Sequence, residues 1–201
     1  MTMTPAPRWI TDTEPGHSEW YIERFREMAA NGQDLFGEAR FIDAMVGRGS
    51  RILDAGCGPG RVGGYLHTVG HDVTGVDVDP KLIGAAEEDY PGPDWQVGDL
   101  ADLDLRDADG SRTGFDAIVC AGNVLAFVAP NTEAVVLQRL SDHLRPDGFV
   151  AVGFHTAKLA VETFDAALAE TDLSLDLRLS TWDVRPWHDD ADFAVSILRR
   201  A

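Results

Sequence analysis

The chain has 201 residues, of which 44% are hydrophobic, and this length and composition predict one folded domain with a sizeable core and exclude a disordered chain. Asp and Glu number 34 against 17 Lys and Arg, so the formal net charge is −17. A field of this sign repels phosphate backbones, and we therefore expect no nucleic-acid partner. The first residues lack the pattern of a signal peptide, and no apolar run is long enough to span a membrane. These features predict a cytoplasmic protein.

The residues ahead of the first predicted strand divide into an arm and two helices. Residues 1–16 are rich in Thr, Pro and Asp, which predicts a mobile arm, and residues 17–201 form the single domain. Apolar residues at helical spacing predict a helix over 18–30 and a second one over 38–46.

The segment from Arg51 to Leu66 is the centre of the predicted fold. A short apolar strand stops at closely spaced glycines and continues as a helix, and the glycines form the pattern DxGxGxG from Asp54 to Gly60. Glycines allow unusual backbone angles and leave room for a ligand at the carboxyl edge of the sheet. The helix that follows presents its N-terminus to the same edge. The GxGxxG pattern of dinucleotide enzymes would need a glycine where Arg61 stands.

Further strands and helices alternate along the rest of the chain. Apolar runs predict strands over 71–77, 95–97, 115–120 and 149–154, with helices over 79–90, 131–144 and 157–170. Two strands then follow in succession, over 173–182 and 193–198, which indicates a terminal antiparallel pair. Asp77 ends the second strand, where a carboxylate can accept hydrogen bonds from both hydroxyls of a ribose. That arrangement indicates adenosine, whether in NAD or in another cofactor.

The glycine segment resembles motif I of the class I S-adenosylmethionine (SAM) dependent methyltransferases, and Asp77 and Asp99-Leu100 after the third strand match further features of that family in the expected order. The resemblance extends over about Leu35 to Arg199. It implies a doubly wound α/β fold, Rossmann-like, whose mostly parallel seven-stranded sheet ends in an antiparallel strand pair. It also implies that SAM is the cofactor and that its methyl group passes by in-line displacement to a nucleophile, here expected on a small molecule.

The same resemblance implies roles for individual residues. Asp99 and Leu100 would meet the adenine ring, and backbone oxygens near Ala121 would meet the methionine ammonium group. Residues 17–47 would form a helical lid whose Tyr21, Arg24 and Arg40 touch the methionine end of SAM or the acceptor; alternatively, the aromatic residue is core and the arginines are solvated. The expected cofactor-binding residues are Asp54, Gly56, Gly58, Gly60, Asp77, Val78, Asp99, Leu100, Ala121, Tyr21 and Arg40.

No catalytic residue is assigned, because a sulfonium methyl group is already activated and positioning can supply most of the acceleration. A base is needed only where the acceptor carries a proton. Asn123 and His155 follow the fourth and fifth strands and are the candidates, although Asn after Gly is equally typical of a turn and most such histidines are structural. An acceptor pocket could be lined by four aromatic residues and one arginine: Trp20, Phe25, Trp182, Trp187 and Arg185.

Other interpretations stay open. The chain is alternatively a SAM-binding protein that transfers nothing, or an NAD(P)-dependent oxidoreductase that shares the glycine turn and Asp77. Cys57 and Cys120 are either a redox pair or small buried residues, and we favour the second reading. His188 and its neighbouring aspartates are consecutive and lack the spacing of metal ligands, so we expect no metal site.

Overall fold

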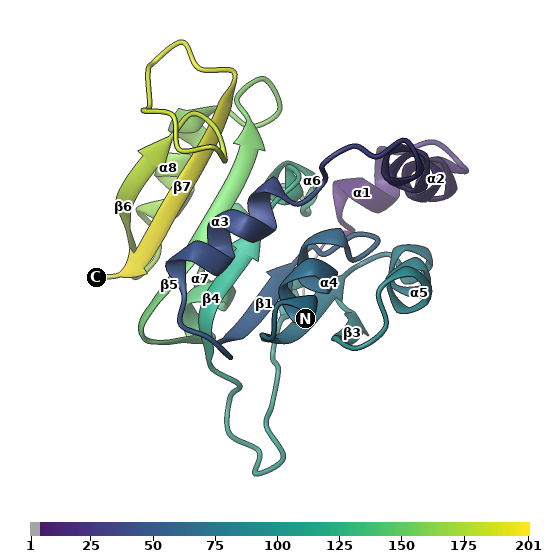
Figure 1. The fold of residues 1–201 in the computed structure, drawn as a ribbon. Helices are drawn as coiled ribbons and strands as arrows, with labels where there is room; N and C mark the ends of the chain where they lie inside the picture. The colour runs from purple at the N-terminus through teal and green to yellow at the C-terminus, as the bar shows by residue number, and fades with distance from the viewer. Residues whose placement is uncertain (1–4) are drawn as a thin grey trace.

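A seven-stranded sheet forms the middle layer of the protein in a computed structural model that describes residues 5–201 (Figure 1). The strand order is β3-β2-β1-β4-β5-β7-β6, in which β1 to β5 run parallel and β7 runs antiparallel to both of its neighbours. This order confirms the predicted sheet with its terminal antiparallel pair. The strands are β1 (Arg51–Ala55), β2 (Asp72–Asp77), β3 (Asp94–Val97), β4 (Phe115–Cys120), β5 (Leu144–His155), β6 (Leu173–Leu179) and β7 (Phe193–Arg200).

Helices follow the parallel strands and precede the sheet. They are α1 (Arg8–Thr11), α2 (His17–Ala30), α3 (Gly37–Met45), α4 (Arg61–Thr68), α5 (Pro80–Asp89), α6 (Val124–Phe127), α7 (Glu133–Asp142) and α8 (Val161–Leu168), with a 3-10 turn η1 (Leu100–Asp102). The two helices predicted ahead of the sheet are present as α2 and α3, whereas the short helices α1 and α6 were not expected. None of the helices within residues 5–201 combines the length and the apolar character needed to cross a membrane.

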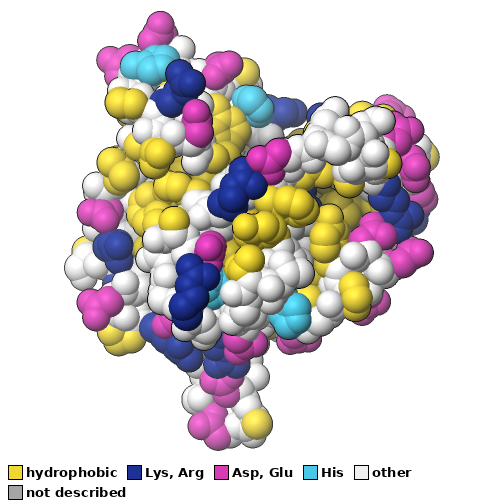
Figure 2. Space-filling model, viewed as in Figure 1, with side chains coloured by type: hydrophobic (Ala, Val, Ile, Leu, Met, Phe, Trp, Pro, Cys, Tyr) yellow, Lys and Arg dark blue, Asp and Glu magenta, His cyan; other side chains and the backbone are white. Residues whose placement is uncertain are grey.

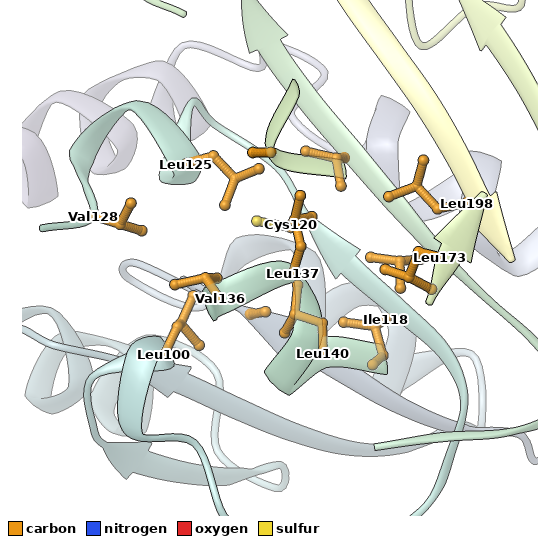
Figure 3. Close-up of a cluster of buried hydrophobic side chains, with 14 of the residues drawn as sticks. Leu100, Ile118, Cys120, Leu125, Val128, Val136, Leu137, Leu140, Leu173 and Leu198 are labelled. Carbon is orange, nitrogen blue, oxygen red and sulfur yellow. The ribbon is translucent and has the colours of Figure 1, made fainter. Parts of the chain in front are cut away.

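The two faces of the sheet bury separate hydrophobic clusters, because successive residues of a strand point to opposite faces. In β4, Ile118 and Cys120 face α7 and α8, whereas Ala117 and Val119 face α3 and α4. Figure 3 shows the first cluster, in which leucines and a valine of α7 lie against β4. Burial on both faces explains why the central strands are nearly continuous apolar runs in the sequence.

The prediction of a mobile arm over residues 1–16 is wrong for its described part, while residues 1–4 lie outside the described residues. Residues 8–11 form α1, and the indole Nε1 of Trp9 donates to Asp79 Oδ2 at 2.9 Å. Asp79 is also the N-cap of α5 and accepts a hydrogen bond from the Ser18 hydroxyl. Arg8 pairs with Glu133 at 3.1 Å. Contacts between residues far apart in the sequence do not alter local composition. Composition alone therefore predicted a mobile arm.

Candidate functional site

The glycine loop between β1 and α4 makes a tight turn that only glycine permits at two points. Gly56 has φ +76°, and a Cβ there would lie 2.4 Å from a methyl group of Val124. Gly60 has φ +83°, and its Cβ would meet Ala86 and the Trp95 ring. The backbone N–H of Gly56 donates to Val76 O at 2.8 Å, which ties the loop to β2. The glycine at position 60 thus allows close packing against α5 and β3.

Two buried carboxylates hold this loop in place. Asp54 at the end of β1 accepts a hydrogen bond from the Gly63 N–H at 2.8 Å. Asp77 at the end of β2 accepts from the Gly58 N–H through Oδ2 and from the Asp79 N–H through Oδ1, both at 2.9 Å. Each oxygen of Asp77 keeps a second lone pair. Asp77 is therefore able to fix the loop and to accept further hydrogen bonds from a ligand.

Burial shifts the titration of both carboxylates. It raises the pKa of Asp54 to about 7 and the pKa of Asp77 to about 6, although backbone hydrogen bonds act in the opposite direction. Both groups are ionised above about pH 7, where their charge is poorly solvated. A bound cation or hydroxyl donor would relieve that cost.

Asp99 and Leu100 follow β3 at the same edge of the sheet. Asp99 Oδ1 accepts from the Ala101 N–H at 2.9 Å and so caps η1, whereas its Oδ2 makes no hydrogen bond within residues 5–201. Leu100 is buried beside it. One side of the Asp99 carboxylate is thus free for an outside donor.

These residues line a first cleft at the carboxyl ends of β1, β2 and β4. Apolar walls come from α1, α2, α5 and α6. Nine of the eleven residues predicted to bind the cofactor line the first cleft: Asp54, Gly56, Gly58, Asp77, Val78, Asp99, Leu100, Ala121 and Tyr21. The two exceptions are Arg40 and Gly60, the last residue of the loop, which approaches Ala86 and Trp95.

The expectation for Arg40 is wrong. Its side chain is exposed on α3 and pairs with Asp34 away from the cleft. The arginine that does line the cleft is Arg61. In the sequence it was noted only because it stands where the GxGxxG pattern requires a glycine. Arg61 pairs with Glu38 and donates to Leu35 O at 2.6 Å. Trp9 is also part of the wall, and its position in a Pro- and Thr-rich segment gave no signal.

A second cleft adjoins the first. Viewed as in Figure 1, the surface is notched between the lobe that carries α2 and the lobe that carries the loop after β6 (Figure 2). Trp20, Phe25 and Trp182 line the second cleft, as predicted for an acceptor pocket. The residues that line both clefts are Trp9, Tyr21, Phe25, Arg61, Gly122 and Phe127.

Two residues predicted for the acceptor pocket lie elsewhere. Arg185 is exposed and pairs with Asp183 at 3.2 Å. Trp187 packs against the hydrophobic cluster on the α7 side, with the Arg178 guanidinium 5.6 Å from its ring centroid. Both belong to the loop between β6 and β7, where no periodicity indicates the direction of a side chain.

Asn123 and His155 both line the second cleft. Asn123 has φ +68°, and its Oδ1 accepts from the His155 N–H at 2.7 Å. The turn interpretation of Asn123 therefore holds, and its side chain also joins the ends of β4 and β5. The His155 ring is exposed and lies edge-on to Phe193, with 4.8 Å between the ring centroids.

Cys57 and Cys120 are free and buried in different hydrophobic clusters. Burial raises the pKa of the Cys120 thiol to about 12, so it stays a neutral apolar group. This supports the reading of both cysteines as small buried residues.

The strand order and a ligand cleft at the carboxyl edge define a Rossmann-like α/β protein. Residues 52–148 match a family model described as a methyltransferase domain. The chain is 41% identical to a TehB-like SAM-dependent methyltransferase from Corynebacterium glutamicum, covering 94% of this chain and 100% of that one with a TM-score of 0.87.

Two curated relatives match more distantly. Identity is 29% over 125 residues with magnesium-protoporphyrin O-methyltransferase of Rhodobacter capsulatus, covering 58% of this chain and 52% of that protein. Identity is 27% over 142 residues with ubiquinone biosynthesis O-methyltransferase of Shewanella pealeana, covering 64% of this chain and 59% of that protein. The chain thus spans about half the length of the curated relatives it matches. It belongs to the class I SAM-dependent methyltransferases, the family of enzymes whose methyl donor is SAM.

Proposed function

We propose that this chain binds SAM in the first cleft and transfers its methyl group to a small molecule held in the second cleft. The observation that carries the proposal is the shared wall between the two clefts, which Tyr21, Gly122 and four other residues form. A cofactor in one cleft and an acceptor in the other would meet at this wall. Two of the relatives described above are O-methyltransferases named for small molecules, which supports an acceptor of that class.

The lining of the first cleft suits each part of SAM. Asp77 would accept hydrogen bonds from the ribose hydroxyls, and the free oxygen of Asp99 would accept one from the adenine amino group. Ala121 follows β4, where its carbonyl oxygen is a candidate partner for the methionine ammonium. The lining has three carboxylates, from Asp54, Asp77 and Asp99, against the single cation of Arg61. An acidic cleft favours SAM, which carries a net positive charge through its sulfonium group.

The reaction itself makes few demands on the protein. When bound, SAM would supply an activated methyl group. A lone pair of the acceptor would bond to the methyl carbon, and the electrons of the broken carbon–sulfur bond would stay on sulfur in S-adenosylhomocysteine (SAH). The clefts would supply alignment and exclusion of water. Helix α2 carries Tyr21 and Phe25 over both clefts, and we include it with α3 in a proposed lid over residues 17–47. His155 is the proposed base where the acceptor is protonated.

Incubation of the purified protein with methyl-labelled SAM, a panel of small molecules and a cell extract tests this function. We expect label in a small-molecule fraction and not in protein or nucleic acid. Retained SAM binding with no labelled product in any fraction would instead favour a SAM-binding protein that transfers nothing.

The affinity for SAM is expected to fall as the solution becomes acidic. Protonation of Asp77 removes the charge that would strengthen the ribose hydrogen bonds, and burial raises its pKa to about 6. Calorimetric titration should therefore give a dissociation constant about tenfold higher at pH 5 than at pH 8, with little change above pH 7. A flat profile over this range would contradict the role of Asp77.

A further inference from the structure

The cations of this chain are almost all neutralised by its many carboxylates. Fourteen of the 17 Lys and Arg side chains lie within 4.0 Å of a carboxylate oxygen. Arg200 instead donates to backbone carbonyls, including Leu144 O at 3.1 Å. Within residues 5–201, only Arg24 and Lys158 have neither a carboxylate partner nor a side-chain hydrogen bond. Both of them line the second cleft.

The charge of the second cleft is therefore opposite to that of the molecule. Its Lys and Arg residues are Arg24, Arg61 and Lys158, and its one carboxylate, Glu38, is already bound to Arg61 at 2.9 Å. Two positive charges remain unbalanced in a chain of net charge −17. The first cleft is acidic, so the two adjoining clefts differ in sign, and charge lining a concave site attracts ligands of the opposite charge.

The two cations lie at opposite ends of a continuous aromatic wall. Ring centroids are 5.6 Å apart between Phe127 and Trp9, 5.5 Å between Trp9 and Tyr21, and 4.9 Å between Tyr21 and Phe25. The Lys158 ammonium lies 5.2 Å from the Phe127 centroid, and the Arg24 guanidinium lies 5.8 Å from the Phe25 centroid. Trp20 and Trp182 add further flat apolar surface. Aromatic walls of this kind bind flat apolar bodies.

We propose that the acceptor is an organic anion, a flat apolar molecule that carries a carboxylate, and that the positive charges of Arg24 and Lys158 attract it into the second cleft. This inference rests on the proposed function, because it names the substrate class of the second cleft. The unpaired cations give the cleft selectivity against uncharged molecules of the same shape, and the aromatic wall gives affinity for the apolar body.

Calorimetric titration of the SAH-saturated protein with matched acids and amides tests the proposal. The probes are benzoate, 2-naphthoate and indole-3-acetate, each compared with its carboxamide, which keeps the size and removes the charge. We expect at least one carboxylate to bind about tenfold more tightly than its amide. The double variant Arg24→Gln/Lys158→Gln should lose this preference while its affinity for SAH stays unchanged. The two single variants should divide the loss between them, each losing about 3-fold of the preference.

Arg185→Gln is the matched control, because Arg185 is an exposed arginine outside both clefts and its replacement should leave the preference intact. Equal binding of acids and amides by the wild-type protein, no binding of any carboxylate, or a preference that survives in the double variant would overturn the inference. Failure of the wild-type protein to bind SAH would instead overturn the proposed function, so the two failures are distinguishable.

Discussion

Replacement of Asp77 with alanine is expected to weaken SAM binding by about 1–3 kcal/mol, the cost of losing hydrogen bonds to a charged group. The carboxylate stands at the end of β2 with a lone pair free on each oxygen, next to the glycine loop that it holds through the Gly58 N–H. The variant loses the acceptor for the ribose hydroxyls and the anchor of the loop at once. Calorimetry at pH 8, where Asp77 is ionised in the wild-type protein, measures the change most clearly.

Asp72→Ala is the matched control for this experiment. Asp72 begins the same strand at its opposite end, and its side chain is 72% exposed, so its loss should leave SAM affinity unchanged within about 0.5 kcal/mol. If Asp77→Ala and Asp72→Ala bound SAM with the same affinity, the ribose would lie elsewhere.

Replacement of Gly56 with alanine is expected to lower the free energy of unfolding by about 2–5 kcal/mol. Two effects add: a left-handed φ of +76° disfavours any residue with a Cβ, and the new methyl group would overlap Val124. Val124 is β-branched and has little rotamer freedom with which to move away. Urea unfolding monitored by circular dichroism gives the change in stability.

Gly84→Ala is the control for this experiment, because a Cβ at Gly84 has room and should stabilise the protein rather than destabilise it. Gly84 lies on the exposed side of α5, and a Cβ there would meet nothing within 4 Å. Alanine should stabilise the helix by about 0.5–1 kcal/mol. Equal stability changes at the two positions would mean that the glycine loop is not strained in the way described.

The order of elements could be predicted from the sequence because each strand is a short apolar run and each helix has its own periodicity. The direction of the last two strands followed from the absence of a helix between them. That the residues at the strand ends meet in one cleft was also predictable, because parallel strands bring their carboxyl ends to one edge. Asp54 and Asp77 belong to β1 and β2 and Asp99 follows β3, and the three meet in one cleft for this reason.

The residues that the sequence misplaced belong to segments whose position depends on tertiary contacts. Arg61 directly follows the glycine loop, whereas Arg40 lies on α3. The docking of α3 places Glu38 against Arg61, while Arg40 pairs with Asp34. Trp9 joins the site through a hydrogen bond to Asp79, 70 residues away. Local composition carries no information about a contact of that range.

Calorimetric titration of the purified protein with SAM, SAH and NAD(H) in parallel tests the central claim most directly. The first cleft, with its three carboxylates and the partners proposed for ribose and adenine, predicts binding of SAM and SAH in the micromolar range and none of NAD(H). Binding of NAD(H) without SAM or SAH would contradict the account.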